Sequence, residues 1–247
     1  MKAVVIIPSR YASSRFPGKP LAVIHDKPMV QWVRENSAKA SSVDDVYVAT
    51  DDERIAEVVK STGGKVLMTR DDHPSGTDRI NEAYNQLNSE YDVIINVQGD
   101  EPFVEPEHID LLVKCFEDPE VNIATLIKAY KPGEDIFDEN KIRVVINKNM
   151  KALYFSRSAI PFVKNEDRNT WQEKTPMYQH IGMYAYRPKT LKELTILTPS
   201  ALEMAESLEQ LRWLENGYDI HTMLTHSESF SVDTPEDLQR LIQLHKK

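Results

Sequence analysis

The first seventy residues alternate between apolar strand patterns and amphipathic helix patterns, and this alternation constrains the fold more than any other feature. Strands are predicted over Ala3–Ile7, Asp45–Thr50 and Lys65–Met68, with helices over Pro28–Ala40 and from Asp51 to Lys60 between them. Residues 3–7 are continuously apolar and largely β-branched, which is typical of a strand covered on both faces. Repeated strand–helix–strand units predict right-handed crossovers and a parallel sheet.

The rest of the chain alternates less regularly. Further strands are predicted at 91–97, 122–128, 142–146, 152–155, 180–186 and 220–224, and further helices after Ser75, at 106–117, at 201–216 and from Pro235. The strands at 142–146 and 152–155 are expected to form an antiparallel pair. Residues 164–176 are mostly polar and are expected to form a surface excursion. This change in pattern places a boundary near residues 130–140.

A purely basic loop follows the first strand. Residues 6–21, IIPSRYASSRFPGKPL, carry three cations and no acid, although the whole chain has a formal net charge of −9. Open α/β sheets bind ligands beyond the carboxyl ends of their strands, so this loop is a candidate phosphate cradle. The alternative is an ordinary solvated turn, because Pro, Gly and Ser also fill such turns. The cations are Arg10, Arg15 and Lys19, and the hydroxyl donors are Ser9, Ser13 and Ser14.

Two further segments carry candidate site residues. In the string HPSGTDRI, Ser75 or Thr77 can cap a helix whose free amides would face an anion, with Arg79 in its first turn. Asp100 follows the strand at 91–97, and Mg²⁺ prefers such hard oxygen ligands together with phosphates and water. A capped surface helix and an acidic turn closed by Pro102 are the simpler alternatives.

Composition excludes several classes of protein. The net charge of −9 and pI near 5.3 disfavour a nucleic-acid or membrane partner, which would favour a basic face. A single cysteine excludes an internal disulfide framework, and no Cys/His cluster has zinc-ligand spacing. Neither a signal peptide nor an apolar run near 18 residues is present, so a cytoplasmic location is expected. The nucleotide-binding strings GxxxxGK[ST] and GxGxxG are also absent, which argues against P-loop NTPases and dinucleotide dehydrogenases.

The basic loop and five later strings occur together in one order: SGTDRI, NVQGDEP, ALYFSR, LEQLR and VDTPEDL. Together they resemble the 3-deoxy-manno-octulosonate (Kdo) cytidylyltransferase family over essentially the whole chain. The resemblance implies a Rossmann-like α/β nucleotidyltransferase fold, a three-layer sandwich with a mostly parallel sheet and a smaller α+β lobe. Residues 1–247 would form one nucleotidyltransferase domain, and two such chains would form a homodimer. Within it, 1–130 would be the nucleotide-binding core, 135–215 the sugar-binding and dimerisation lobe, and 218–247 the return to the core.

The reaction implied by the resemblance joins CTP to a Kdo-type eight-carbon sugar acid, giving a CMP-sugar and pyrophosphate for lipopolysaccharide biosynthesis. Catalytic roles are implied for Arg10, Lys19, Asp100 and Asp233, and the two aspartates would bind Mg²⁺. Nucleotide contacts are implied for Arg10, Arg15, Lys19, Ser75, Gly76, Thr77 and Gln98. Sugar contacts are implied for Arg79, Gln98, Arg157, His180, Tyr184, Glu209 and Gln210.

Two alternatives remain open from the sequence. The forms SSRF and SGTDRI also occur in relatives that prefer an 8-amino sugar, so the acceptor could be 8-amino-Kdo or another sugar acid. The chain could instead be an inactive nucleotide-sensing module on the same fold, although it retains both aspartates and all three loop cations.

Overall fold

The computed structural model describes residues 1–13 and 15–244, and its contacts divide the chain into two compact units. Unit 1 comprises Met1–Val113 and Ser229–Lys247, and unit 2 comprises Lys114–Glu228. These divisions differ from the boundaries expected at 130–135 and 215–218. The strands at 123–129 and 221–225 pair with each other, so both belong to unit 2.

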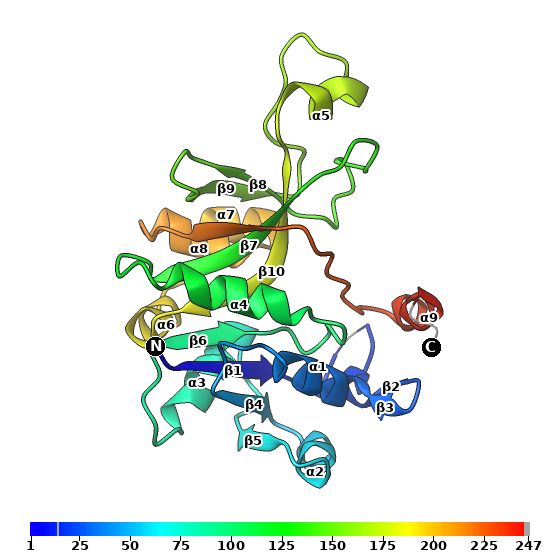
Figure 1. The fold of residues 1–247 in the computed structure, drawn as a ribbon, viewed down its shortest axis with the longest axis vertical. Coiled ribbons are helices and arrows are strands. Elements are labelled where there is room, and N and C mark those ends of the chain that lie inside the picture. Colours follow the sequence, from blue (N-terminus) through cyan, green and yellow to red (C-terminus); the bar gives the residue numbers. More distant parts are fainter. Residues whose placement is uncertain (14, 245–247) are drawn as a thin grey trace. The chain divides into compact units, whose positions relative to one another are not determined.

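Unit 1 contains a parallel sheet in the order β6–β1–β4–β5 (Figure 1). Its strands are β1 (Ala3–Pro8), β4 (Asp45–Thr50), β5 (Lys65–Met68) and β6 (Val93–Asn96). Residues 3–7 of β1 are fully buried, as expected for a central strand covered on both faces. The predicted strands and their parallel arrangement are confirmed in this unit.

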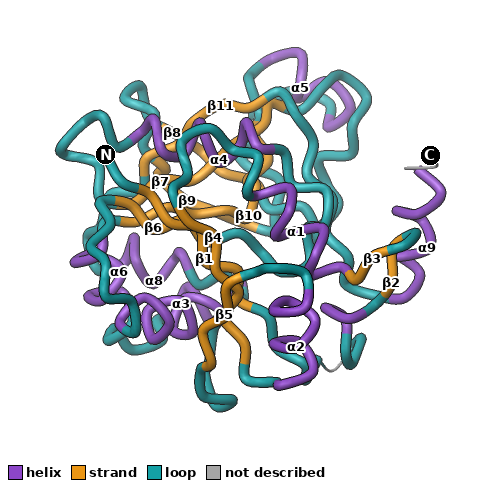
Figure 2. Tube along the Cα trace, turned by 60° about the horizontal axis from the view of Figure 1, so that its bottom comes forward, coloured by secondary structure: helices purple, strands orange, loops and turns teal. Residues whose placement is uncertain are grey.

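Helices cover both faces of this sheet. They are α1 (Met29–Ser37), α2 (Glu53–Ser61) and α3 (Gly76–Asn85). Two further helices are α4 (Pro106–Cys115), which crosses the unit boundary, and α9 (Pro235–Leu244). In Figure 2 the strands β1, β4 and β5 run between α3 on one side and α1 and α2 on the other. A short hairpin of β2 (Val23–Ile24) and β3 (Lys27–Pro28), absent from the sequence prediction, precedes α1.

The strand order of unit 1 reverses at β1. The chain proceeds outward from β1 to β4 and β5 and then returns to β6 on the other side of β1. Right-handed crossovers therefore place α1 and α2 on one face and α3 on the opposite face. The loops that leave β1 and β6 diverge at this switch point, which is where open α/β sheets bind ligands.

Unit 2 is built on a mixed sheet. Its central strand β7 (Ile123–Ala129) pairs in parallel with β11 (His221–Thr225) and antiparallel with β10 (Tyr178–Tyr186). The predicted antiparallel pair is confirmed as β8 (Arg143–Ile146) with β9 (Ala152–Ser156), and β8 joins β10. The helices are α5 (Trp171–Lys174), α6 (Pro188–Leu194), α7 (Ala201–Glu206) and α8 (Gln210–Glu215).

One prediction for unit 2 is wrong and a second is incomplete. The single helix expected at 201–216 is two helices, because Ser207 takes a left-handed conformation with φ 52° and ends α7. The polar segment at 164–176 is not only a surface excursion, since Trp171 is 3% exposed and packs with Tyr130, Ile136 and Met177. One buried indole is enough to anchor an otherwise hydrophilic segment.

Across the described part of the chain, every helix falls short of the length and apolar character that crossing a membrane would require.

Candidate active site

The basic loop after β1 is held in a closed turn. The Gly18 amide donates to the Tyr11 carbonyl at 2.9 Å, and Gly18 has a φ of 71°. This left-handed conformation strains any residue with a Cβ, and a Cβ here would also lie 3.1 Å from the Tyr11 ring. The Arg54 guanidinium lies over the same ring, 3.4 Å from its centroid. The turn places Lys19 at the start of a short 3-10 helix, Lys19–Leu21.

The acidic turn after β6 packs directly against this loop. A Cβ on Gly99 would lie 2.6 Å from the Pro8 carbonyl oxygen, so only glycine permits this approach. The next two residues have different environments. Asp100 lines the pocket, whereas Glu101 is 6% exposed and accepts a hydrogen bond from Ser229 at 2.6 Å. Burial raises the pKa of Glu101 to about 7.

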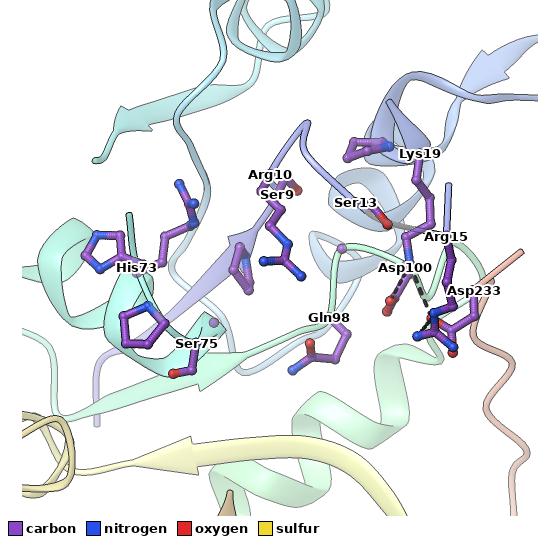
Figure 3. Close-up of a pocket in the computed structure, with 16 residues that line it drawn as sticks. Ser9, Arg10, Ser13, Arg15, Lys19, His73, Ser75, Gln98, Asp100 and Asp233 are labelled. Atoms are coloured by element: carbon purple, nitrogen blue, oxygen red, sulfur yellow. Dashed lines mark hydrogen bonds and ion pairs between the residues drawn. The ribbon is translucent and has the colours of Figure 1, made fainter. Parts of the chain in front are cut away.

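Asp100 and Asp233 approach the same ammonium group. Lys19 Nζ lies 2.8 Å from Asp100 Oδ2 and 3.6 Å from Asp233 Oδ1, and it donates to the Val232 carbonyl at 2.7 Å. Arg15 lies 3.0 Å from Asp233 Oδ1. Figure 3 shows these four side chains together on one side of the pocket, with His73 and Ser75 on the other. Unit 1 alone therefore brings the loop cations and both aspartates to one place.

A pocket of about 280 Å³ opens between these loops. Four cations line it, Arg10, Arg15, Lys19 and Arg79, against the two carboxylates of Asp100 and Asp233. The Arg10 side chain is exposed and forms no hydrogen bond or ion pair with any residue that the structure describes. An excess of cations at this point is suited to a polyanionic ligand. Ser9, Ser13 and Gln98 also line the pocket; Ser14 lies outside the described residues.

The amino end of α3 forms the far wall. The Ser75 hydroxyl accepts from the Asp78 amide as predicted for the helix cap, and Ser75 and Gly76 line the pocket. Thr77 is buried and is not among the residues that line the pocket. Arg79 also lines the pocket, but its Nη1 is held by Asp51 at 2.9 Å and by the Thr69 hydroxyl at 2.6 Å.

His73 was not predicted as a site residue. It lines the pocket, and its ring nitrogen bonds to Glu82, which leaves the side chain only 4% exposed. It is the first residue of the HPSGTDRI string, and that position was the only signal available. A histidine next to a predicted helix cap is too common to be singled out by its sequence context.

Four of the predicted sugar-binding residues lie together in unit 2. His180 is buried, with Nε2 2.9 Å from the Thr125 hydroxyl, and burial lowers the pKa of this histidine to about 3, which keeps it neutral. Tyr184 packs against His180 with the ring centroids 5.3 Å apart, and burial raises the pKa of the tyrosine. The break at Ser207 places Glu209 and the buried Gln210 at the start of α8.

Arg157 is held at the end of α7. Its guanidinium donates to the main-chain carbonyls of Glu206 at 2.7 Å and Glu139 at 3.0 Å, and the Glu206 carboxylate accepts from its amide. These contacts fix the side chain and leave fewer of its donors for a ligand.

Asp100 and Asp233 fit a magnesium ion by their chemistry. They supply hard carboxylate oxygens beside a cationic pocket, and Mg²⁺ commonly takes one or two carboxylates together with phosphates and water. Within residues 1–13 and 15–244, no three His, Cys, Asp or Glu side chains form a group that could hold a metal. The pair therefore suits an ion that a nucleotide would help to bind.

Comparison with known proteins identifies the family. The profile of the cytidylyltransferase family matches residues 4–220. This chain belongs to the cytidylyltransferase family. Proteins named 3-deoxy-manno-octulosonate cytidylyltransferase from Parabacteroides distasonis and Bacteroides thetaiotaomicron are each 52% identical to this cytidylyltransferase. The matches cover 98% and 97% of the chain and 97% and 96% of the two relatives. The resemblance drawn from the six strings is thereby confirmed.

Solved structures match the fold of this cytidylyltransferase as well. A structure of CMP:2-keto-3-deoxy-manno-octonic acid synthetase complexed with CTP has a TM-score of 0.91 and 43% identity, covering 99% of this chain and 98% of that one. A glucose-1-phosphate thymidylyltransferase from Bacillus anthracis, at 17% identity, has a TM-score of 0.67 over 99% and 96% of the two chains and shares the fold. The predicted α/β nucleotidyltransferase fold is confirmed.

Proposed function

We propose that this cytidylyltransferase transfers CMP from CTP to the anomeric hydroxyl of Kdo and releases pyrophosphate. The observation that carries the proposal is the convergence of Arg15, Lys19, Asp100 and Asp233 in one pocket at the switch point of the sheet. Support comes from the relatives with 52% identity that are named for this reaction, and from the similar synthetase solved with CTP.

The residues of the pocket suit phosphoryl chemistry. Attack on the α-phosphorus by a hydroxyl requires positioning and neutralisation of charge, with little covalent work for side chains. Arg10, Arg15 and Lys19 would bind the triphosphate and stabilise the departing pyrophosphate. The amides at the start of α3, near Ser75 and Gly76, would donate to the same anion.

Magnesium is the cofactor that we propose. Asp100 and Asp233 would hold the ion, which when bound neutralises charge on the phosphates and helps to align them. Lys19 would keep the two carboxylates close to each other, as it does through its contacts of 2.8 and 3.6 Å.

The acceptor is a carboxylate, which requires a cation and several neutral polar groups. We propose that Arg79 and Arg157 face the acceptor carboxylate, and that Gln98, His180, Tyr184, Glu209 and Gln210 bind its hydroxyls. The neutral state of His180, which follows from its lowered pKa, is compatible with a hydrogen-bonding role toward an uncharged hydroxyl. We further propose a cytoplasmic homodimer that acts in lipopolysaccharide biosynthesis.

The test is a panel of acceptors. The protein is incubated with CTP, MgCl₂ and either Kdo, 8-amino-Kdo or N-acetylneuraminate, and pyrophosphate release is measured, with product masses read from mixtures at equal concentration. We expect turnover with Kdo. Preference for 8-amino-Kdo would change the substrate and keep the chemistry, and CTP binding without turnover on any acceptor would favour the nucleotide-sensing alternative.

Two single substitutions test the assignment of Asp100 and Asp233 as magnesium ligands. Asp100→Asn and Asp233→Asn are expected to abolish nearly all Mg²⁺-dependent turnover, because each replaces a charged oxygen ligand by a neutral amide. Glu57→Gln, an exposed carboxylate on α2, serves as the matched control and is expected to retain full activity. Full activity in both aspartate variants would remove the assignment.

A further inference from the structure

A buried carboxyl group lies next to the proposed metal ligand Asp100 but outside the pocket. Glu101 is 6% exposed and is not among the residues that line the pocket. Its backbone is fixed by two turns, since its amide donates to the Gln98 carbonyl and its carbonyl accepts from the Val104 amide, both at 3.2 Å. The side chain accepts a 2.6 Å hydrogen bond from the Ser229 hydroxyl. The Glu101 carboxyl, buried and outside the pocket, therefore contacts a residue 128 positions later in the chain.

That contact bears on how Asp233 is placed. Residues 229–233 form neither helix nor strand, so no ladder of backbone hydrogen bonds fixes them. The segment is attached at Val232, whose amide donates to the Asp100 carbonyl at 2.9 Å and whose carbonyl accepts from Lys19 at 2.7 Å. The Ser229–Glu101 bond is a second attachment three residues earlier.

Two attachments restrain the segment 229–233 more than one attachment does. An attachment at Val232 alone would fix one point of the segment and let the chain before it pivot. Three residues of chain span at most about 10 Å, so a second attachment at Ser229 also restricts the direction of the segment. Asp100 and Glu101 are adjacent, so both attachments are made to one rigid turn. The turn that carries Asp100 thus also orients the segment that carries Asp233.

We propose that Glu101 is a positioning residue, which through Ser229 aligns the segment of Asp233 with the turn of Asp100 and so sets the spacing of the two carboxylates. This inference rests on the proposed function in one respect, that the two aspartates hold a metal–nucleotide complex. Glu101 itself lies outside the pocket, so in this role it would act without contacting metal or nucleotide.

The test measures binding of Mn²⁺·CTP by calorimetry in the absence of any acceptor, so no turnover is involved. Glu101→Ala and Ser229→Ala are each expected to weaken binding about tenfold, because each removes a hydrogen bond to a buried carboxyl group. Glu101→Gln keeps an acceptor for the Ser229 hydroxyl and is expected to recover most of the affinity. Glu105→Gln, an exposed carboxylate four residues away, is the matched control and should bind as the unmodified protein does.

The double variant Glu101→Ala with Ser229→Ala tests whether the two residues act through their shared hydrogen bond or whether each change damages its own surroundings. If the two residues act through one bond, Glu101→Ala with Ser229→Ala together lose no more affinity than either change alone. Additive losses would overturn the proposal, as would equal losses in Glu101→Gln and Glu101→Ala. If Glu101→Ala does not melt cooperatively, Ser229→Ala and Glu101→Gln still decide the outcome.

The same measurements distinguish a failure of the proposed function from a failure of the positioning role of Glu101. If the unmodified protein shows no Mn²⁺-dependent CTP binding, the proposed function is overturned and the positioning role with it. If the unmodified protein binds and the folded Glu101→Ala and Ser229→Ala variants bind equally well, only the positioning role is overturned.

Discussion

Replacement of Lys19 by methionine tests the centre of the site through stability as well as activity. The Lys19 side chain is 14% exposed, and its ammonium contacts the Asp100 carboxylate at 2.8 Å, the Val232 carbonyl at 2.7 Å and Asp233 at 3.6 Å. Methionine keeps the unbranched side chain as far as Cε and removes the charged Nζ. The change leaves two carboxylates near each other without their shared cation.

The expected loss follows from these contacts. A hydrogen bond to a charged group contributes about 1.5–3 kcal/mol, and the second bond to a carbonyl adds about 1 kcal/mol. Because Lys19 and Asp100 are mostly buried, solvent screens this pair less than a surface pair. We therefore expect Lys19→Met to lower the free energy of unfolding by about 3 kcal/mol, or the melting temperature by about 6–12 °C. The value of kcat/KM for CTP should fall about a hundredfold or more.

Urea unfolding and pyrophosphate release measure the two effects. Lys39→Met is the control, since Lys39 is exposed and its ammonium donates to the uncharged Asn36 side chain instead of a carboxylate. Its effect on stability should stay within about 0.5 kcal/mol. A Lys19→Met protein as stable as this control would refute the argument that Lys19 holds the two acidic segments together. Retained turnover would refute its place at the triphosphate.

Three other predictions concern separate features of the molecule. Asp233→Asn should change the free energy of unfolding by less than about 1 kcal/mol, because its pair with Arg15 is largely exposed, while kcat/KM falls at least about a hundredfold; melting and pyrophosphate release compare the two. Gly18→Ala should destabilise the loop by about 1–2 kcal/mol and raise the KM for CTP, and an unchanged KM would count against a role for this turn. The lowered pKa of His180 means that below about pH 6.5 the unfolded chain binds a proton that the folded protein does not, so stability should fall by about 1.4 kcal/mol per pH unit toward pH 4. His180→Gln should flatten that slope in urea unfolding.

The strands of unit 1 were predictable because their signal is local. Continuous apolar runs such as Ala3–Ile7 identify buried strands, and the helices between them require a parallel arrangement. The pocket follows from the same reasoning, since residues just after β1 and β6 must meet at the carboxyl edge of the sheet. The proximity of Asp233 had no such local signal and came only from the resemblance of VDTPEDL to the family.

What the sequence could not reveal depends on distant partners. The helix break at Ser207 leaves the apolar periodicity of 201–216 intact, so the pattern predicted one helix where the backbone forms two. Trp171 lies in a polar segment and is buried only because Tyr130 and Ile136 come to it from elsewhere in the chain. Glu101 carries the same chemical signal as Asp100, and its burial outside the pocket and its partner Ser229 distinguish a positioning role from metal binding.

The charge distribution explains why these local contacts matter so much for a nucleotide ligand. The chain has a net charge of −9, so at distance it repels a polyanion instead of attracting one. At physiological ionic strength, charges farther away than about 8 Å are largely screened, which weakens that repulsion and leaves the nearest side chains to dominate. The pocket concentrates four cations against two acids, and Lys19 is already shared by those two acids. Affinity for a triphosphate therefore depends on how the loop holds its cations in place. The closed turn at Gly18 and the attachments of residues 229–233 thus affect that affinity as much as the charges themselves do.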